Sequence, residues 1–114
     1  MTMDETAELV ASLKLVGVDG DGGEHAILVG VATPRRQPTG EWACPTLSYD
    51  FQEPRPIYGE SSLQALCLGL SFIRLRLEDF LDKGGRLFLE DVRDEVSRQD
   101  LAAVFSGVGG AGPG

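Results

Sequence analysis

The sequence lacks any long hydrophobic run, since none approaches the roughly 20 apolar residues that cross a bilayer. Its first six residues include two acidic residues and no basic one, and no apolar segment follows them, so we expect no secretory signal and a cytoplasmic location. It has one histidine and two cysteines, too few for a ready metal site, and no Walker loop, dinucleotide fingerprint or nucleophile elbow. We therefore assign no catalytic residue, no metal ligand and no cofactor.

Basic residues are also scarce, with 10 against 18 acidic ones and a formal net charge of −8. Such a charge argues against binding to nucleic acid or to an anionic membrane and suits a basic protein partner. The 114 residues are enough for one domain with one hydrophobic core. Cys44 and Cys67 both stand in apolar contexts, so we expect both to be buried as small hydrophobic residues.

Three segments alternate between apolar and polar residues as β-strands do, at residues 8–19, 25–33 and 41–52. A turn of Asp and Gly, residues 19–24, joins the first two. In the third segment, Leu47, Tyr49 and Phe51 point one way. The alternate positions there are polar: Thr46, Ser48 and Asp50. This pattern predicts a sheet with one solvent-facing polar face, and Pro45 marks an edge, a bulge or a late strand start.

The strongest pattern in the chain predicts a long helix from Ser61 to Lys83. Ser61 and Gln64 form a Ser-x-x-Gln capping box, and Gly84-Gly85 provides a stop. Large apolar residues recur at spacings of three and four and share one stripe: Leu63, Leu66, Leu70, Ile73, Leu77 and Phe80. Four more broaden that stripe: Leu68, Phe72, Leu75 and Leu81. We expect the whole stripe to face the sheet.

The pattern of residues 86–90 predicts a short fourth strand. Residues 91–105 could be either a loop or a segment that contains a short helix, with Ser97 as its candidate cap. The predicted fold is therefore α+β and two-layered, with three to four antiparallel strands covered on one face by one helix at about 61–83. A single domain, residues 8–105, is expected between two disordered ends, residues 1–7 and the Gly-rich residues 106–114.

Three short motifs imitate functional sites. Gly59-Glu-Ser-Ser-Leu63 is similar to the phosphopantetheine site of carrier proteins, with Ser62 as the attachment point, but the β-rich flanks favour a capped helix start. Asp19-x-Asp21-Gly22 opens like a calcium loop, yet the twelfth position is Gly30, so a hairpin turn is favoured. His25 has no motif that supplies a nucleophile or an orienting partner, so an exposed or capping role is favoured.

Residues 55–70 resemble a bacterial family of small domains of unknown function. Ile57-Tyr-Gly59 leads into a helix start of sequence Ser-Leu-Gln-Ala-Leu that ends at Leu66, and the helix closes with a Gly-Gly-x-Leu step into a last strand. Ser61 stands where the family usually has Asp, which keeps the cap. The resemblance implies a sheet-plus-helix domain and supplies no catalytic residue. That build is similar to the build of many immunity proteins that neutralise bacterial toxins.

We therefore predict a non-catalytic protein-binding domain of immunity type or accessory type. Its expected binding surface is the polar sheet face with a neighbouring tyrosine: Thr46, Ser48, Asp50 and Tyr58. Two alternatives remain open. A deep pocket lined by Tyr49, Tyr58 or Trp42 would favour a small-molecule-binding domain, and a carboxylate bonded to His25 in a cleft would favour an enzyme.

Overall fold

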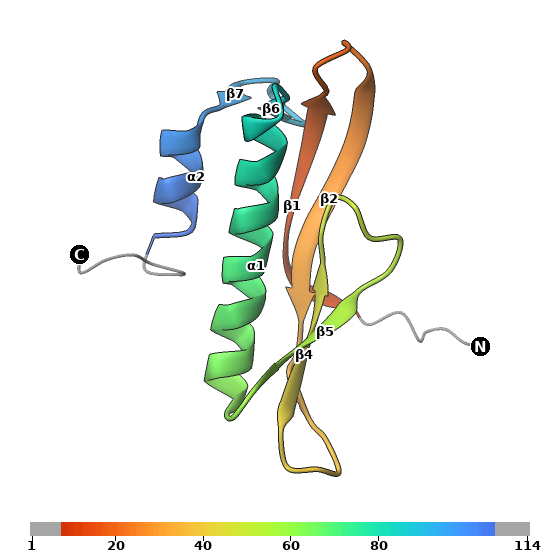
Figure 1. Cartoon of the computed structure of the whole chain (residues 1–114), viewed down its shortest axis with the longest axis vertical. Coiled ribbons are helices and arrows are strands. Elements are labelled where there is room, and N and C mark those ends of the chain that lie inside the picture. Colours follow the sequence, from red (N-terminus) through yellow and green to blue (C-terminus); the bar gives the residue numbers. More distant parts are fainter. Residues whose placement is uncertain (1–7, 107–114) are drawn as a thin grey trace.

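The computed structural model describes residues 8–106 as one antiparallel sheet with two helices (Figure 1). The strands are β1 Leu9–Val18, β2 Glu24–Ala32, β3 Arg35–Arg36, β4 Trp42–Leu47, β5 Arg55–Gly59, β6 Arg86–Leu89 and β7 Glu95–Val96. The helices are α1 Ser62–Asp82 and α2 Arg98–Val104. The α+β class with one long helix is confirmed, whereas seven strands exceed the three to four predicted. Residues 1–7 and 107–114, predicted to be disordered, lie outside the described residues.

The first strand lies inside the sheet. β1 pairs along its length with β2, and Leu15 to Val18 pair on the other edge with β6. The register shifts between Leu9 and Ala11, which makes Val10 the extra residue of a β-bulge. The turn between β1 and β2 contains Gly22 at φ 90°, a conformation that glycine adopts without strain. The predicted hairpin is therefore confirmed.

Three short strands escape the sequence pattern because two to five residues are too few to show alternation. β4 pairs with β5 along one edge, while β2 and β3 share its other edge. β3 is therefore a continuation of β2 after a break at Thr33-Pro34. Pro45 and Pro56 face each other across β4 and β5, a position where neither residue has to donate a backbone hydrogen bond.

Both helices begin at the cap residues that the sequence predicts, Ser61 and Ser97, but the capping box predicted for Ser61 and Gln64 is only half formed. The Ser61 hydroxyl accepts a hydrogen bond of 3.0 Å from the backbone N–H of Gln64, whose side chain accepts one of 2.6 Å from the N–H of Glu60. At α2, Ser97 and Asp100 form a complete capping box. The candidate short helix is thus confirmed. Among the described residues, neither helix is long and apolar enough to cross a membrane.

The core lies between α1 and the face of the sheet that we call the inner face. Its fully buried side chains come from both layers: Leu15, Val31, Cys44, Ile73, Leu77, Leu87 and Leu101. In Figure 1, α2 lies beside α1 on the side away from β2. Helix α1 approaches the sheet closely at Gly69, where a Cβ atom would lie 2.6 Å from Thr46 Oγ1.

That close approach rotates the first half of α1 away from the predicted orientation. Ile73, Leu77 and Phe80 are buried as predicted, and Leu66 and Leu70 pack partly buried against the core. The fully inward positions nearer the N-terminus are Ala65, which lies against Gly59 of β5, and Gly69, which faces β4. Leu63, Leu68 and Leu75, which we expected to face the sheet, are exposed instead. Small residues can contact a neighbouring backbone more closely than leucine can, so they take the inner position.

Candidate functional site

The sheet face that we predicted to be polar and solvent-exposed is mostly buried. Thr46 and Ser48 are 0% and 1% exposed and lie on the inner face beneath α1. Their polar groups are satisfied locally, because Thr46 donates to the carbonyl of Cys44 and Ser48 donates to the carboxylate of Asp50. The prediction was wrong because buried hydroxyls with short-range partners give the same alternation as a solvated strand.

Asp50 and Tyr58, the other two predicted binding residues, do reach solvent. The carboxylate of Asp50 accepts a 2.6 Å hydrogen bond from Arg76 of α1. Burial acts to raise the pKa of Asp50, but the bonds from Ser48 and Arg76 hold it below its ordinary value. Tyr58 lies on the opposite, outer face of the sheet and is half exposed. The four predicted residues are therefore divided between two faces and do not form one site.

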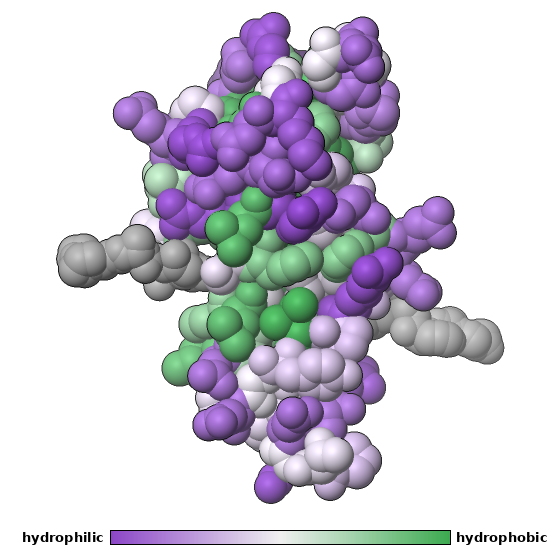
Figure 2. Space-filling view, in the orientation of Figure 1, coloured by the Kyte–Doolittle hydropathy of each residue, from purple (hydrophilic) through white to green (hydrophobic). Residues whose placement is uncertain are grey.

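The largest unexpected feature is the apolar outward side of α1. Leu63, Leu68 and Leu75 are 68%, 42% and 60% exposed. Phe72 lies one turn from Leu68 and stacks on Phe51 with ring centroids 5.6 Å apart. Figure 2 shows the resulting apolar area in the middle of this face, between polar regions above and below it. At 100° per residue, Leu68, Phe72 and Leu75 share one side of the helix, and we name these three the α1 apolar surface.

The charges of α1 are confined to its second half. Residues 62–73 include no Asp, Glu, Lys or Arg, whereas ion pairs follow from Arg74 onward. Arg74 pairs with Glu78, and Lys83 pairs with Asp79 at 3.0 Å, both at the i,i+4 spacing of neighbours on a helix. Cys67, which we expected to be buried, is exposed in the uncharged half, while Cys44 is buried as expected. An outward helix side without charge is typical of a covered helix.

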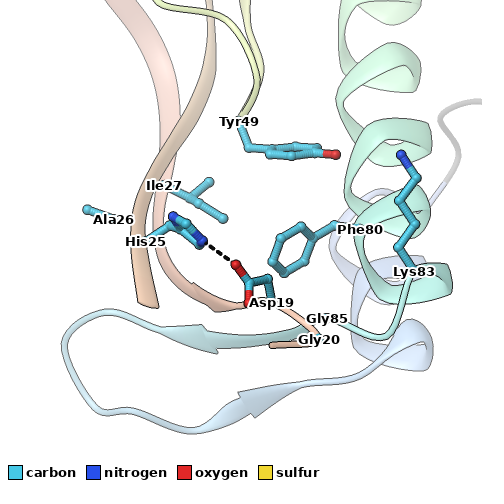
Figure 3. A pocket seen from close by; sticks show the side chains of 9 residues that line it. All are labelled: Asp19, Gly20, His25, Ala26, Ile27, Tyr49, Phe80, Lys83 and Gly85. Carbon is cyan, nitrogen blue, oxygen red and sulfur yellow. Dashed lines mark hydrogen bonds and ion pairs between the residues drawn. The ribbon is translucent and has the colours of Figure 1, made fainter. Parts of the chain in front are cut away.

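A cleft of about 430 Å³ opens at the other end of α1. Figure 3 shows that it gathers side chains from the β1–β2 turn, β2, the segment after β4 and the end of α1. Ile27, Tyr49 and Phe80 form its apolar walls, and the two aromatic rings meet edge to face with centroids 5.3 Å apart. Asp19, His25 and Lys83 supply its charged and polar groups.

Asp19 fixes the histidine of this cleft. One carboxylate oxygen accepts from the backbone N–H groups of Asp21 and Gly23, both at 2.9 Å, and the other lies 2.8 Å from His25 Nε2. The bond from His25, followed by those from the turn, holds the pKa of Asp19 below its ordinary value. Because an ionised carboxylate only accepts, Nε2 carries a proton, and Nδ1 has no partner within residues 8–106.

A carboxylate that orients a histidine is half of a general-base arrangement. This contact is the one that favours the enzyme alternative, but the nine residues that line the cleft include no serine, threonine or cysteine that could act as a protein nucleophile. Within residues 8–106, no three metal-ligating side chains gather at one place. The arrangement therefore supplies hydrogen-bonding groups next to aromatic walls, with no assembled catalytic set among the lining residues. Sequence reasoning noted both Asp19 and His25, but six residues of separation concealed their contact.

Comparison of the chain with protein-family models, with curated proteins and with solved structures finds no match.

Proposed function

We propose that this protein is a non-catalytic binding domain that docks another protein on the α1 apolar surface. The observation that carries the proposal is the exposure of Leu68 and Leu75 on a helix whose residues 62–73 include no charged side chain. A surface helix normally turns charged residues to solvent, and a helix that is apolar on both sides is normally covered on both sides. The sheet covers one side of α1 here, so a partner would cover the other.

The partner that fits this surface is a different protein with a net positive charge. Two copies of the chain would each bring a formal charge of −8, and their mutual repulsion works against self-association. The same charge attracts a basic partner and accelerates encounter, while the apolar contact supplies the affinity. Within this proposal, the chain is a cytoplasmic member of the bacterial family that residues 55–70 resemble, of immunity type or accessory type.

The test replaces two leucines at the centre of the surface. In Leu68→Gln/Leu75→Gln the helix propensity is kept while apolar contact area is removed. Burial of two half-exposed leucines contributes roughly 2–3 kcal/mol, so binding should weaken by about 30-fold or more. The matched control is Leu28→Thr, which removes an exposed leucine from the outer face of the sheet.

The assay is affinity capture from the native host with quantitative mass spectrometry, followed by titration of the captured protein. We expect the wild type and Leu28→Thr to retain the same basic protein, and the double variant to lose it. Binding of that protein to the wild type should weaken at high salt. A partner retained by the double variant and lost by Leu28→Thr would move the site to the outer sheet face. A concentration-dependent dimer of the wild type, broken by the double variant, would replace the basic partner with a second copy.

A further inference from the structure

We propose that the cleft at the end of α1 binds a small, neutral, planar ring compound that carries one N–H or O–H donor. The cleft shares no residue with the α1 apolar surface, so this site is independent of the proposed protein docking. Its volume of about 430 Å³ lies within the usual range for small-molecule sites, roughly 300–1,000 Å³.

The shape of the ligand follows from the walls. Figure 3 shows the rings of His25, Tyr49 and Phe80 around one space, with the side chain of Ile27 beside them. Two glycines leave room for the buried ring of Phe80, because a Cβ atom on Gly85 would lie 2.5 Å from that ring and one on Gly17 would lie 3.0 Å from it. Fixed aromatic walls favour a flat apolar ligand, since rings pair face to face or edge to face at little cost.

The hydrogen-bonding group of the ligand follows from the tautomer of His25. Asp19 holds the proton on Nε2, so in the neutral imidazole Nδ1 has a free lone pair and acts as an acceptor. Asp19 is itself fixed by the two backbone donors of the turn, which gives the histidine a defined orientation. A ligand with an N–H or O–H group can satisfy Nδ1, and one without such a donor cannot.

The charges around the cleft favour a neutral ligand. An anion would meet the carboxylate of Asp19 and the negative end of the α1 dipole. A cation would meet Lys83, whose ammonium stays charged because its bond with Asp79 raises its pKa. Neither sign of charge therefore gains a net attraction at this site.

The experiment compares indole with 1-methylindole, which has the same ring and no donor, by amide NMR titration of the full chain at pH 8. We expect saturable shifts at residues 19–27, 49 and 80–85, and a dissociation constant for indole three- to tenfold lower than for 1-methylindole. In His25→Phe an aromatic ring remains but the hydrogen-bond acceptor is lost. The affinity for indole should therefore fall to the affinity for 1-methylindole. Indole-3-acetate should bind more weakly than indole because it is an anion.

Shifts confined to the groove of Leu13, Val29, Leu70 and Val104, or no saturation by either indole, would overturn the proposal. Equal affinity of both probes in the wild type would overturn the role of His25. Melting curves of His25→Phe check that the variant is folded. Because Leu68→Gln/Leu75→Gln leaves the cleft unaltered, this variant should bind indole as the wild type does. The proposal for the cleft and the proposal for the docking surface can therefore be refuted independently.

Discussion

Gly69→Ala is the substitution that tests the packing of α1 on β4 most directly. A Cβ atom at this position would lie 2.6 Å from Thr46 Oγ1 and 3.4 Å from both Cys44 Sγ and Val31 Cγ1. Thr46 cannot rotate away freely, because its hydroxyl donates a 3.0 Å hydrogen bond to the carbonyl of Cys44. The new methyl group must therefore displace the helix or break that bond.

The expected magnitude is the difference between two opposing effects. Overpacking of a tight core costs about 1–3 kcal/mol, and loss of one hydrogen bond costs about 1 kcal/mol. Replacement of a mid-helix glycine by alanine stabilises the helix by about 1 kcal/mol through its higher helix propensity. We expect Gly69→Ala to destabilise the protein by about 1–2 kcal/mol, a fall of roughly 5–10 °C in Tm for a domain of this size.

Urea unfolding followed by the fluorescence of Trp42, the single tryptophan, measures the change because Trp42 packs against the core. The decisive comparison repeats Gly69→Ala in a Thr46→Ala background, where the obstructing hydroxyl is absent. There the substitution should be neutral or stabilising by up to about 1 kcal/mol, which gives a coupling energy near 2 kcal/mol. If Gly69→Ala stabilises the protein equally in both backgrounds, Thr46 does not lie beneath the helix and the described packing is wrong.

Three further predictions concern other parts of the fold. Asp19→Asn should lower the Tm at neutral pH. The difference in Tm from the wild type should vanish as the pH falls through the depressed pKa of Asp19, because the carboxylate stabilises the fold only while it is ionised. Equal Tm values for the two proteins from pH 3 to 7 would contradict this prediction. Ile73→Ala should cost about 2–5 kcal/mol in urea titrations, whereas Leu63→Ala should cost little, and similar losses at both positions would refute the described rotation of α1. Ser97→Ala should cost about 1 kcal/mol through the lost cap of α2, and unchanged hydrogen exchange there would show that the cap does not stabilise the helix.

The elements whose signals are local could be predicted from the sequence. Ser61 and Ser97 mark their helix starts because capping depends on residues three positions apart. The hairpin of β1 and β2 follows from a turn of Asp and Gly between two alternating runs. The short strands β3, β5 and β7 exist only because a longer strand lies next to them, and the sequence contains no local sign of that neighbour.

The candidate sites depended on tertiary geometry and were therefore harder to predict. Thr46 and Ser48 read as surface residues because hydrophobic periodicity reports polarity and does not report whether a polar group finds a partner. Leu68 and Leu75 were predicted to be core residues because their spacing places them on an apolar stripe. When a helix is apolar on several sides, that spacing does not show which side faces the sheet. The cleft joins four segments of the chain, so only the folded structure brings Asp19, His25 and Lys83 together.

The position of β1 has a consequence for biosynthesis. Val18 pairs with Arg86, so one edge of the N-terminal strand stays unpaired until 68 further residues have been made. A nascent chain that has reached only the end of α1 already contains β1, β2, β4 and β5, yet exposes the apolar edge of Leu15 and Val16 that β6 later covers. Released chains truncated at Lys83 should therefore bind a chaperone, and chains that continue past β6 and α2 should bind less of it. The hydrogen bonds between β1 and β6 can therefore form only after β2, β4, β5 and α1 have been made.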